Sequence, residues 1–195
     1  MAPTRGTVSP RRRDRTGKPM RKALIMLGML SDSDTDWLAA IAERRTLPAG
    51  TRIIEEGKPI ASLFIVLDGT ARVSVQQTDV ARVTGGELLG EVSMIDQRPP
   101  AASVTADTDT TVLAVDRALL EQRLRDDTGF GCRFYHAVAV CLADRLRSSV
   151  ARLGHGGAPP PEDLANDDEL DPRTRDTARL AAARFDALRK GVPRA

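Results

Sequence analysis

The chain has few aromatic residues, which make up 3% of its 195 positions and include one tryptophan and one tyrosine. A core must therefore be built mainly from Leu, Ile, Val, Ala and Met, which the sequence supplies. Domains cluster near roughly 100 to 150 residues, so this length suits one domain with additional terminal segments.

Long apolar runs are absent, since none approaches the ~20 residues that a membrane-spanning helix requires. The N-terminus is rich in arginine, but it lacks an apolar segment that ends in a small-residue cleavage site, so no secretory signal is predicted. The chain has two cysteines, Cys132 and Cys141. On one helix they lie about half a turn out of phase and cannot form a disulfide with each other. We expect both cysteines to act as small, buried apolar residues, and two free thiols suit a cytoplasmic protein.

Signatures of catalysis are missing as well. Neither His136 nor His155 has partners at metal-ligand spacing or a third residue that would orient it as a base. Ser93 and Ser103 have no recognisable histidine partner, and no P-loop, dinucleotide fingerprint or Cys-x-x-Cys pair is present. We therefore predict that the chain is not an enzyme and requires no metal or cofactor.

Positive charge is concentrated at the start of the chain. Residues 1–22 hold eight basic residues and one acidic residue, a local charge of +7, so the remainder of a chain with net charge +2 carries −5. This block has no apolar periodicity, which predicts a disordered basic tail. The tail could contact nucleic acid or an acidic membrane. The alternatives are a solvated tail or a true start at Met20.

Short apolar runs punctuated by glycine begin after Thr46. Residues 70–75 alternate between apolar and polar positions, and the preceding Asp68-Gly69 is a hairpin turn signal. Strands spaced in this way predict a β-sandwich or jelly roll. The predicted strands are 51–54, 62–67, 70–76, 80–83, 103–106 and 111–115.

Helices are expected on both sides of these strands. The cluster Ser31–Asp34 can cap a helix over about 34–42, in which Trp37 has a core role. Asp116 can cap a helix that ends near 123 or 124, and a longer helix is expected from 128 or 129 to 153. Apolar and small residues recur on this long helix at 3-4-3-4 spacing, namely Ala139, Leu142, Leu146, Ser149 and Leu153. That seam suits either a contact between two subunits or a cover for the chain's own sandwich.

The last part of the chain changes composition. Residues 154–171 form a Gly/Pro-rich and acidic linker, and residues 172–195 a short C-terminal helical segment. A winged helix-turn-helix needs roughly 60 to 80 residues, more than this region offers, so no sequence-specific DNA binding is expected. The folded domain is predicted to span residues 23–153.

The stretch from Gly86 to Val104 is the most informative motif, because a glycine-led turn into a short helix can hold a phosphate on backbone amides. It resembles the phosphate-binding cassette of the cyclic nucleotide-binding domain family, the catabolite activator protein and protein kinase A regulatory subunit type. The family pattern reads F-G-E-[LIV]-[AS]-L, then P-R-[AST]-A-[TS]-V. Residues 89–94 match its first half and residues 99–104 its second half.

The resemblance implies specific roles and one loss. Glu91 would accept the ribose 2′-hydroxyl hydrogen, whereas the phosphate-binding arginine is replaced by Pro100. Arg98 could substitute for that arginine or simply face solvent, and Glu91 could instead only stabilise the start of a helical turn. The candidate pocket for cAMP or cGMP comprises Gly90, Glu91, Val92, Ser93, Arg98, Ala101, Ala102 and Ser103.

The resemblance continues upstream through Gly50, Ile53, Gly57, residues 63–66, Gly69 and Val73, and covers about residues 24–153. It implies a jelly-roll domain flanked by N-terminal and C-terminal helices. The expected function is a regulatory module with a degenerate cassette and weak or absent cyclic nucleotide binding. Such a module would act on a protein partner or a second copy through helix 129–153. The alternative is a working cAMP or cGMP sensor whose ligand repositions that helix.

Overall fold

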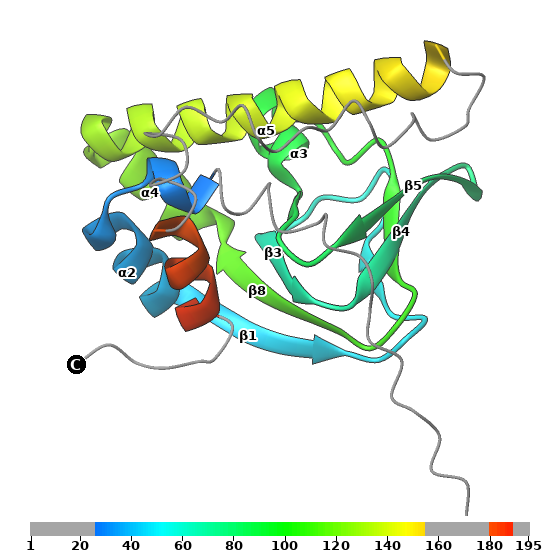
Figure 1. Ribbon diagram of the computed structural model, residues 1–195, viewed down its shortest axis with the longest axis horizontal. Helices are drawn as coiled ribbons and strands as arrows, with labels where there is room; N and C mark the ends of the chain where they lie inside the picture. The colour runs from blue at the N-terminus through cyan, green and yellow to red at the C-terminus, as the bar shows by residue number, and fades with distance from the viewer. Residues whose placement is uncertain (1–25, 155–179, 189–195) are drawn as a thin grey trace, which may run out of the picture.

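The computed structural model describes residues 26–154 and 180–188, including a first helical stretch at 26–29 (Figure 1). The elements that follow are α2 (Asp32–Ile41), β1 (Ala42–Leu47), β2 (Arg52–Ile54), β3 (Ser62–Asp68), β4 (Thr70–Val75), β5 (Thr78–Thr84), β6 (Leu88–Leu89), α3 (Glu91–Asp96), β7 (Ser103–Ala106), β8 (Thr110–Asp116), α4 (Arg117–Asp126) and α5 (Thr128–Gly154). Residues 180–188 form a further helix.

The strands form two antiparallel four-stranded sheets, with the orders β1-β8-β3-β6 and β2-β7-β4-β5. Side chains alternate between the two faces of β3. Phe64 and Val66 belong to a core cluster with residues of the second sheet, whereas Leu63, Ile65 and Leu67 pack in a cluster with the helices. Both faces of β3 are therefore covered, which explains its unbroken apolar sequence. The predicted β-sandwich with flanking helices is confirmed.

The predicted strands correspond to β2, β3, β4, β5, β7 and β8, while β1 and β6 were not predicted. The predicted helix 34–42 begins two residues earlier, at Asp32, and ends at Ile41. Strand β1 has a charged, largely exposed sequence and lies at the edge of its sheet. Charged edge strands protect a sheet from further pairing, but they give no apolar signal to read.

Helix α5 changes its surroundings along its length. Its first half buries a continuous face, made of Phe130, Phe134, Ala137, Val138 and Cys141. Beyond this half, Leu146, Val150 and Leu153 are 58–80% exposed. The first half therefore covers the chain's own sandwich, as one of the two expected roles required. The expectation for Cys132 was wrong, because this residue is exposed on α5.

An ion-pair cluster joins α2 to α4 and α5. Ser31 caps α2, with its hydroxyl accepting from the Asp34 backbone N–H, while the Asp34 carboxylate accepts from the Ser31 N–H. Asp34 is fully buried and binds Arg133 at 2.7 and 3.0 Å and Arg123 at 3.3 Å. Arg123 also lies over the half-buried Trp37 ring, 4.4 Å from its centroid. The cap cluster and the core role of Trp37 agree with the sequence analysis.

The C-terminal helix of residues 180–188 packs on the helical side of the sandwich. Ala181 and Phe185 are buried in the same core cluster as Leu27, Leu30 and α5. The rest of the predicted segment 172–195, the basic tail 1–22 and the linker 155–171 lie outside the described residues. Among the helices that the structure describes, every one is too short or too polar to cross a bilayer.

Candidate functional site

The cassette turn connects β6 to α3 through Gly90. This residue has φ 90° and ψ 0°, in the left-handed region that L side chains rarely adopt. A Cβ at this position would lie 2.7 Å from Ile60 Cδ1. Glycine is therefore favoured by the turn, and a larger residue would also have to displace the end of the Ile60 side chain.

Glu91, the residue with the expected ribose role, is the first residue of α3 and is 2% exposed. Its carboxylate accepts a hydrogen bond from Arg145 Nη1 of α5. The second terminal nitrogen of Arg145 donates to the Leu88 carbonyl at 2.9 Å and lies 3.8 Å from Glu87 Oε2. One arginine of α5 thus contacts both β6 and α3, where the long helix passes over α3 (Figure 1).

Burial dominates the electrostatics of Glu91. Removal of the carboxylate from water raises its pKa above the usual range, and the charge of nearby Glu87 adds to this effect. The charge and hydrogen bond of Arg145 act in the opposite direction without cancelling it. Burial therefore disfavours the charged form of Glu91, and Arg145 favours it.

In the second half of the cassette, polar groups form hydrogen bonds to other residues of the chain. Pro100 is buried, and its carbonyl accepts from the Gly57 N–H at 2.8 Å. Ser103 is also buried, and its hydroxyl accepts from the Glu56 N–H at 3.1 Å. These bonds fasten the end of the cassette to the 55–58 turn and place no cation at the position that the resemblance assigns to arginine.

The remaining predicted residues differ in exposure. Ser93 is buried in α3 and Ala102 is half-buried, whereas Val92 and Ala101 are exposed. Arg98 is exposed, and its backbone N–H donates to Asp96 Oδ1 at 3.0 Å. Its solvent-facing position matches one of the two alternatives left open by the sequence.

Arg145 was not predicted as a site residue. It lies 54 positions after Glu91, so no local motif links the two. The available signal was the need of a buried carboxylate for a cation, which the cassette itself does not supply.

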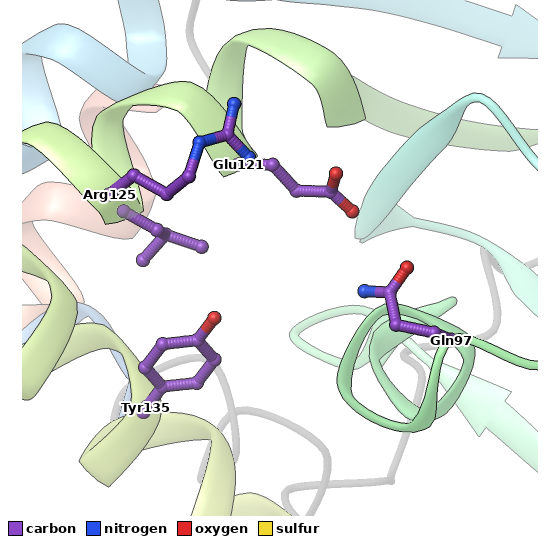
Figure 2. Close-up of a pocket in the computed structure, with 5 residues that line it drawn as sticks. Gln97, Glu121, Arg125 and Tyr135 are labelled. Carbon is purple, nitrogen blue, oxygen red and sulfur yellow. The ribbon is translucent and has the colours of Figure 1, made fainter.

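A separate cleft of about 280 Å³ lies between the end of α3, α4 and α5. Figure 2 shows Gln97, Glu121, Arg125 and Tyr135 around it. Arg117 donates to both Gln97 Oε1 and Glu121 Oε1 and lowers the pKa of Glu121. None of the predicted cassette residues lines this cleft.

The sequence is similar to known proteins over the part of the chain that contains these features. Residues 44–127 match the cyclic nucleotide-binding domain family. The Cyclic AMP receptor protein of Thermus thermophilus is 30% identical over 132 residues, which cover 64% of this chain and 58% of that protein. The cAMP-dependent protein kinase regulatory subunit of Aspergillus fumigatus is 36% identical over 72 residues, or 36% of this chain and 17% of that protein. The chain spans less than two thirds of either relative.

Solved structures show the same fold. A cyclic nucleotide-binding domain from Methylobacillus flagellatus has a TM-score of 0.62 at 24% identity, over 70% of this chain and 83% of that one. The Thermus thermophilus Catabolite Activator Protein has a TM-score of 0.55 at 23% identity, over 84% of each chain. The glycine-led cassette and the two antiparallel sheets agree with these comparisons, in which residues 44–127 match the cyclic nucleotide-binding domain family.

Proposed function

We propose that this chain is a regulatory cyclic nucleotide-binding domain with a degenerate cassette, which binds cyclic nucleotide weakly or not at all and acts through protein contacts without catalysing a reaction. The observation that carries the proposal is Pro100. This residue is buried at the arginine position of the cassette, and its carbonyl is bonded to Gly57.

The missing cation has a predictable effect on affinity. A hydrogen bond to a charged group contributes about 1.5 to 3 kcal/mol, and every 1.4 kcal/mol corresponds to tenfold in the dissociation constant. A cyclic phosphate held on the backbone amides of residues 90–92 alone would therefore bind roughly tenfold to a hundredfold more weakly. Ser103 could offset only part of this loss, because its hydroxyl has a single hydrogen to donate and carries no positive charge.

The pairing of Glu91 supports the same proposal. Its carboxylate is buried and already bonded to Arg145, so a ribose hydroxyl would have to share or displace that contact. The pair also neutralises the positive charge closest to Glu91. An anionic ligand would thus meet a guanidinium that is engaged with two carboxylates and one carbonyl.

A second function, the cAMP or cGMP sensor, is favoured by Arg145 itself. This side chain is 35% exposed and belongs to α5, so it can turn from Glu91 towards a bound phosphate. Such a movement would loosen one contact between α5 and the cassette and reposition the helix. Under this alternative, Arg145 replaces the cation that the cassette lacks.

Isothermal titration of the full chain with cAMP and with cGMP separates the two functions. Under the degenerate-cassette proposal, binding is weak or absent, and Pro100→Arg strengthens it at least tenfold. The exposed neighbour provides the control Pro99→Arg, which should have no such effect. Tight binding by the unchanged chain that is lost in Arg145→Gln would overturn the proposal in favour of the sensor.

The contact surface that we propose is the end of α5. Leu146, Val150 and Leu153 are exposed at spacings of four and three, the pattern of a two-helix seam. We propose that this seam binds the same seam of a second copy. Sedimentation equilibrium should show a dimer that Leu146→Glu converts to monomer, while the control Ala40→Glu, at an exposed alanine of α2, leaves it intact. A monomeric unchanged chain would remove this part of the proposal.

A further inference from the structure

The junction between the helical residues 26–29 and α2 contains backbone carbonyls that need hydrogen-bond donors from outside the helix. The last carbonyls of a helix have no intrahelical donors, and they carry the partial negative charge of the helix C-terminus. Here the Leu27 and Leu30 carbonyls accept from Arg184 Nη1, at 2.6 and 2.8 Å. A guanidinium from the far end of the chain therefore satisfies this helix end.

The same guanidinium also binds the start of α2. Arg184 Nε and Nη2 donate to Asp32 Oδ1, at 3.0 and 2.7 Å. Arg184 is only 4% exposed, and a buried cation requires acceptors of this kind. Two carbonyls and a carboxylate around one planar group suit arginine, whose donors point in fixed directions, better than lysine.

Apolar contacts surround this polar anchor. Ala181 and Phe185 are buried three positions before and one position after Arg184, and Leu188 packs against the same cluster. Anchors at such spacing lie on one face of a helix, the pattern of a helix that docks in an apolar groove. Figure 1 shows the C-terminal helix, in red, beside α2 and the first helical residues, in blue.

The position of this helix depends on its contacts. The 25 residues from 155 to 179 can span at most ~90 Å when extended. This is about twice the ~40 Å length of the 27-residue α5, so the connection alone does not fix where the helix lies. Most of a helix's stability in a protein comes from the packing of its buried face, which here is formed by Ala181, Arg184 and Phe185. Helix formation and docking are therefore coupled.

We propose that residues 26–32 form a docking site for an arginine-bearing amphipathic helix, which the chain fills with its own residues 180–188. The docked helix leaves and returns as a unit while the sandwich stays folded. Arg184 is the residue that selects this site. The contact does not involve the cassette, so it holds whichever cyclic nucleotide function is correct.

Hydrogen–deuterium exchange of the full chain, read by mass spectrometry, tests the proposal. Arg184→Gln should accelerate exchange at least tenfold in residues 180–188 and 26–32, with β3 and β8 unchanged. Ala183→Gln, on the exposed side of the same helix, should behave as the unchanged chain. Unaltered protection of residues 180–188 in Arg184→Gln would overturn the proposal. Equal acceleration in β3 and β8 would also overturn it, since the helix would then open only with the whole domain.

Two further measurements avoid dependence on that variant. Asp32→Asn removes the negative charge from a side chain that is 69% exposed but keeps an oxygen that can accept from Arg184, so it should accelerate exchange in the same two segments by a smaller factor. A labelled peptide of residues 178–190 should bind the full-length Phe185→Ala protein saturably, because that variant weakens the chain's own helix and leaves residues 26–32 unchanged. The same peptide with Arg184→Gln should bind at least tenfold more weakly. Equal binding of the two peptides, or no binding of either, would contradict an arginine-selective site.

Discussion

Two buried carboxylates that pair with arginines of α5 have pKa values shifted in opposite directions. Asp34 and Glu91 are both no more than 2% exposed, and both bind arginines of this helix. For Asp34, burial raises the pKa, but hydrogen bonds from Arg133 and Ser31 and the charge of Arg133 outweigh it and lower the pKa to about 2. For Glu91, burial prevails and the pKa is raised.

The number of donors around each carboxylate explains this difference. Asp34 accepts from two arginines and a backbone N–H, whereas Glu91 meets one arginine and lies near the like charge of Glu87. Burial alone therefore does not set the sign of a pKa shift. Asp34 is held in its charged form as a structural anchor, whereas burial disfavours the charged form of Glu91.

The largest effect is expected from Asp34→Ala. The loss of the bond from the Ser31 N–H to the Asp34 carboxylate, one half of the capping box, costs up to about 1 kcal/mol, and the ion pairs that lower the pKa contribute about 2 kcal/mol. The free energy of unfolding at pH 7 should therefore fall by about 3 kcal/mol in a denaturant titration. The exposed carboxylate of Asp36 on the same helix provides the control, since Asp36→Ala should change it by about 0.5 kcal/mol or less. A loss below about 1 kcal/mol for Asp34→Ala would contradict the anchor role.

The acid dependence of stability sharpens the comparison. The lowered pKa of Asp34 means that its contribution is present above the unfolded value of 3.8 and is lost as pH falls through about 2. The stability difference between the unchanged chain and Asp34→Asn should shrink by about 2 kcal/mol between pH 4 and pH 2. Urea titrations across this range measure it, and a constant difference would show that the charge of Asp34 is not involved.

A double-mutant cycle on Glu91 and Arg145 should give an effect of similar or smaller size. Arg145→Gln leaves a buried carboxylate without its cation and should cost about 2 kcal/mol at pH 7, a value discounted for the partial exposure of Arg145. Because burial raises the pKa of Glu91, this cost should grow as pH rises from about 4.5 and shrink as the carboxylate takes up a proton. Adding Glu91→Gln should recover part of it, and additive costs would show that the two residues are uncoupled.

The smallest effect concerns the cassette turn. Gly90→Ala should destabilise the fold by about 1 to 2 kcal/mol, because alanine is strained at this φ and its Cβ would press on Ile60. Gly57 also has a positive φ, of 76°, but nothing lies within 4 Å of its added Cβ. Gly57→Ala therefore measures backbone strain alone, at about 1 kcal/mol. Equal thermal shifts for the two variants would mean that Ile60 moves aside freely.

Local sequence signals predicted most of the fold. The alternation in β4, the apolar run of β3 and the cap residues Ser31 and Asp116 all act between near neighbours, and each element formed where expected. The long helix α5 also begins and ends within about one residue of its predicted bounds. Strand β1 was missed because its pairing with β8 depends on a distant segment and leaves charged side chains outward.

The site divides in the same way. Gly90 and Glu91 belong to one continuous motif, so the local sequence is enough to predict them. Arg145 contacts Glu91 across 54 positions, and Arg184 contacts Leu27 across 157. Such contacts depend on how helices are placed over a sheet, which no spacing rule within one segment contains.

The contact between Arg184 and Leu27 has a consequence for the order of folding during synthesis. A ribosome adds about 5 to 20 residues per second, so the 157 positions between these residues take roughly 8 to 30 seconds. Throughout that interval the Leu27 and Leu30 carbonyls must rely on water or on a temporary partner. The earliest helices of the domain thus reach their final state only after the last helix has emerged.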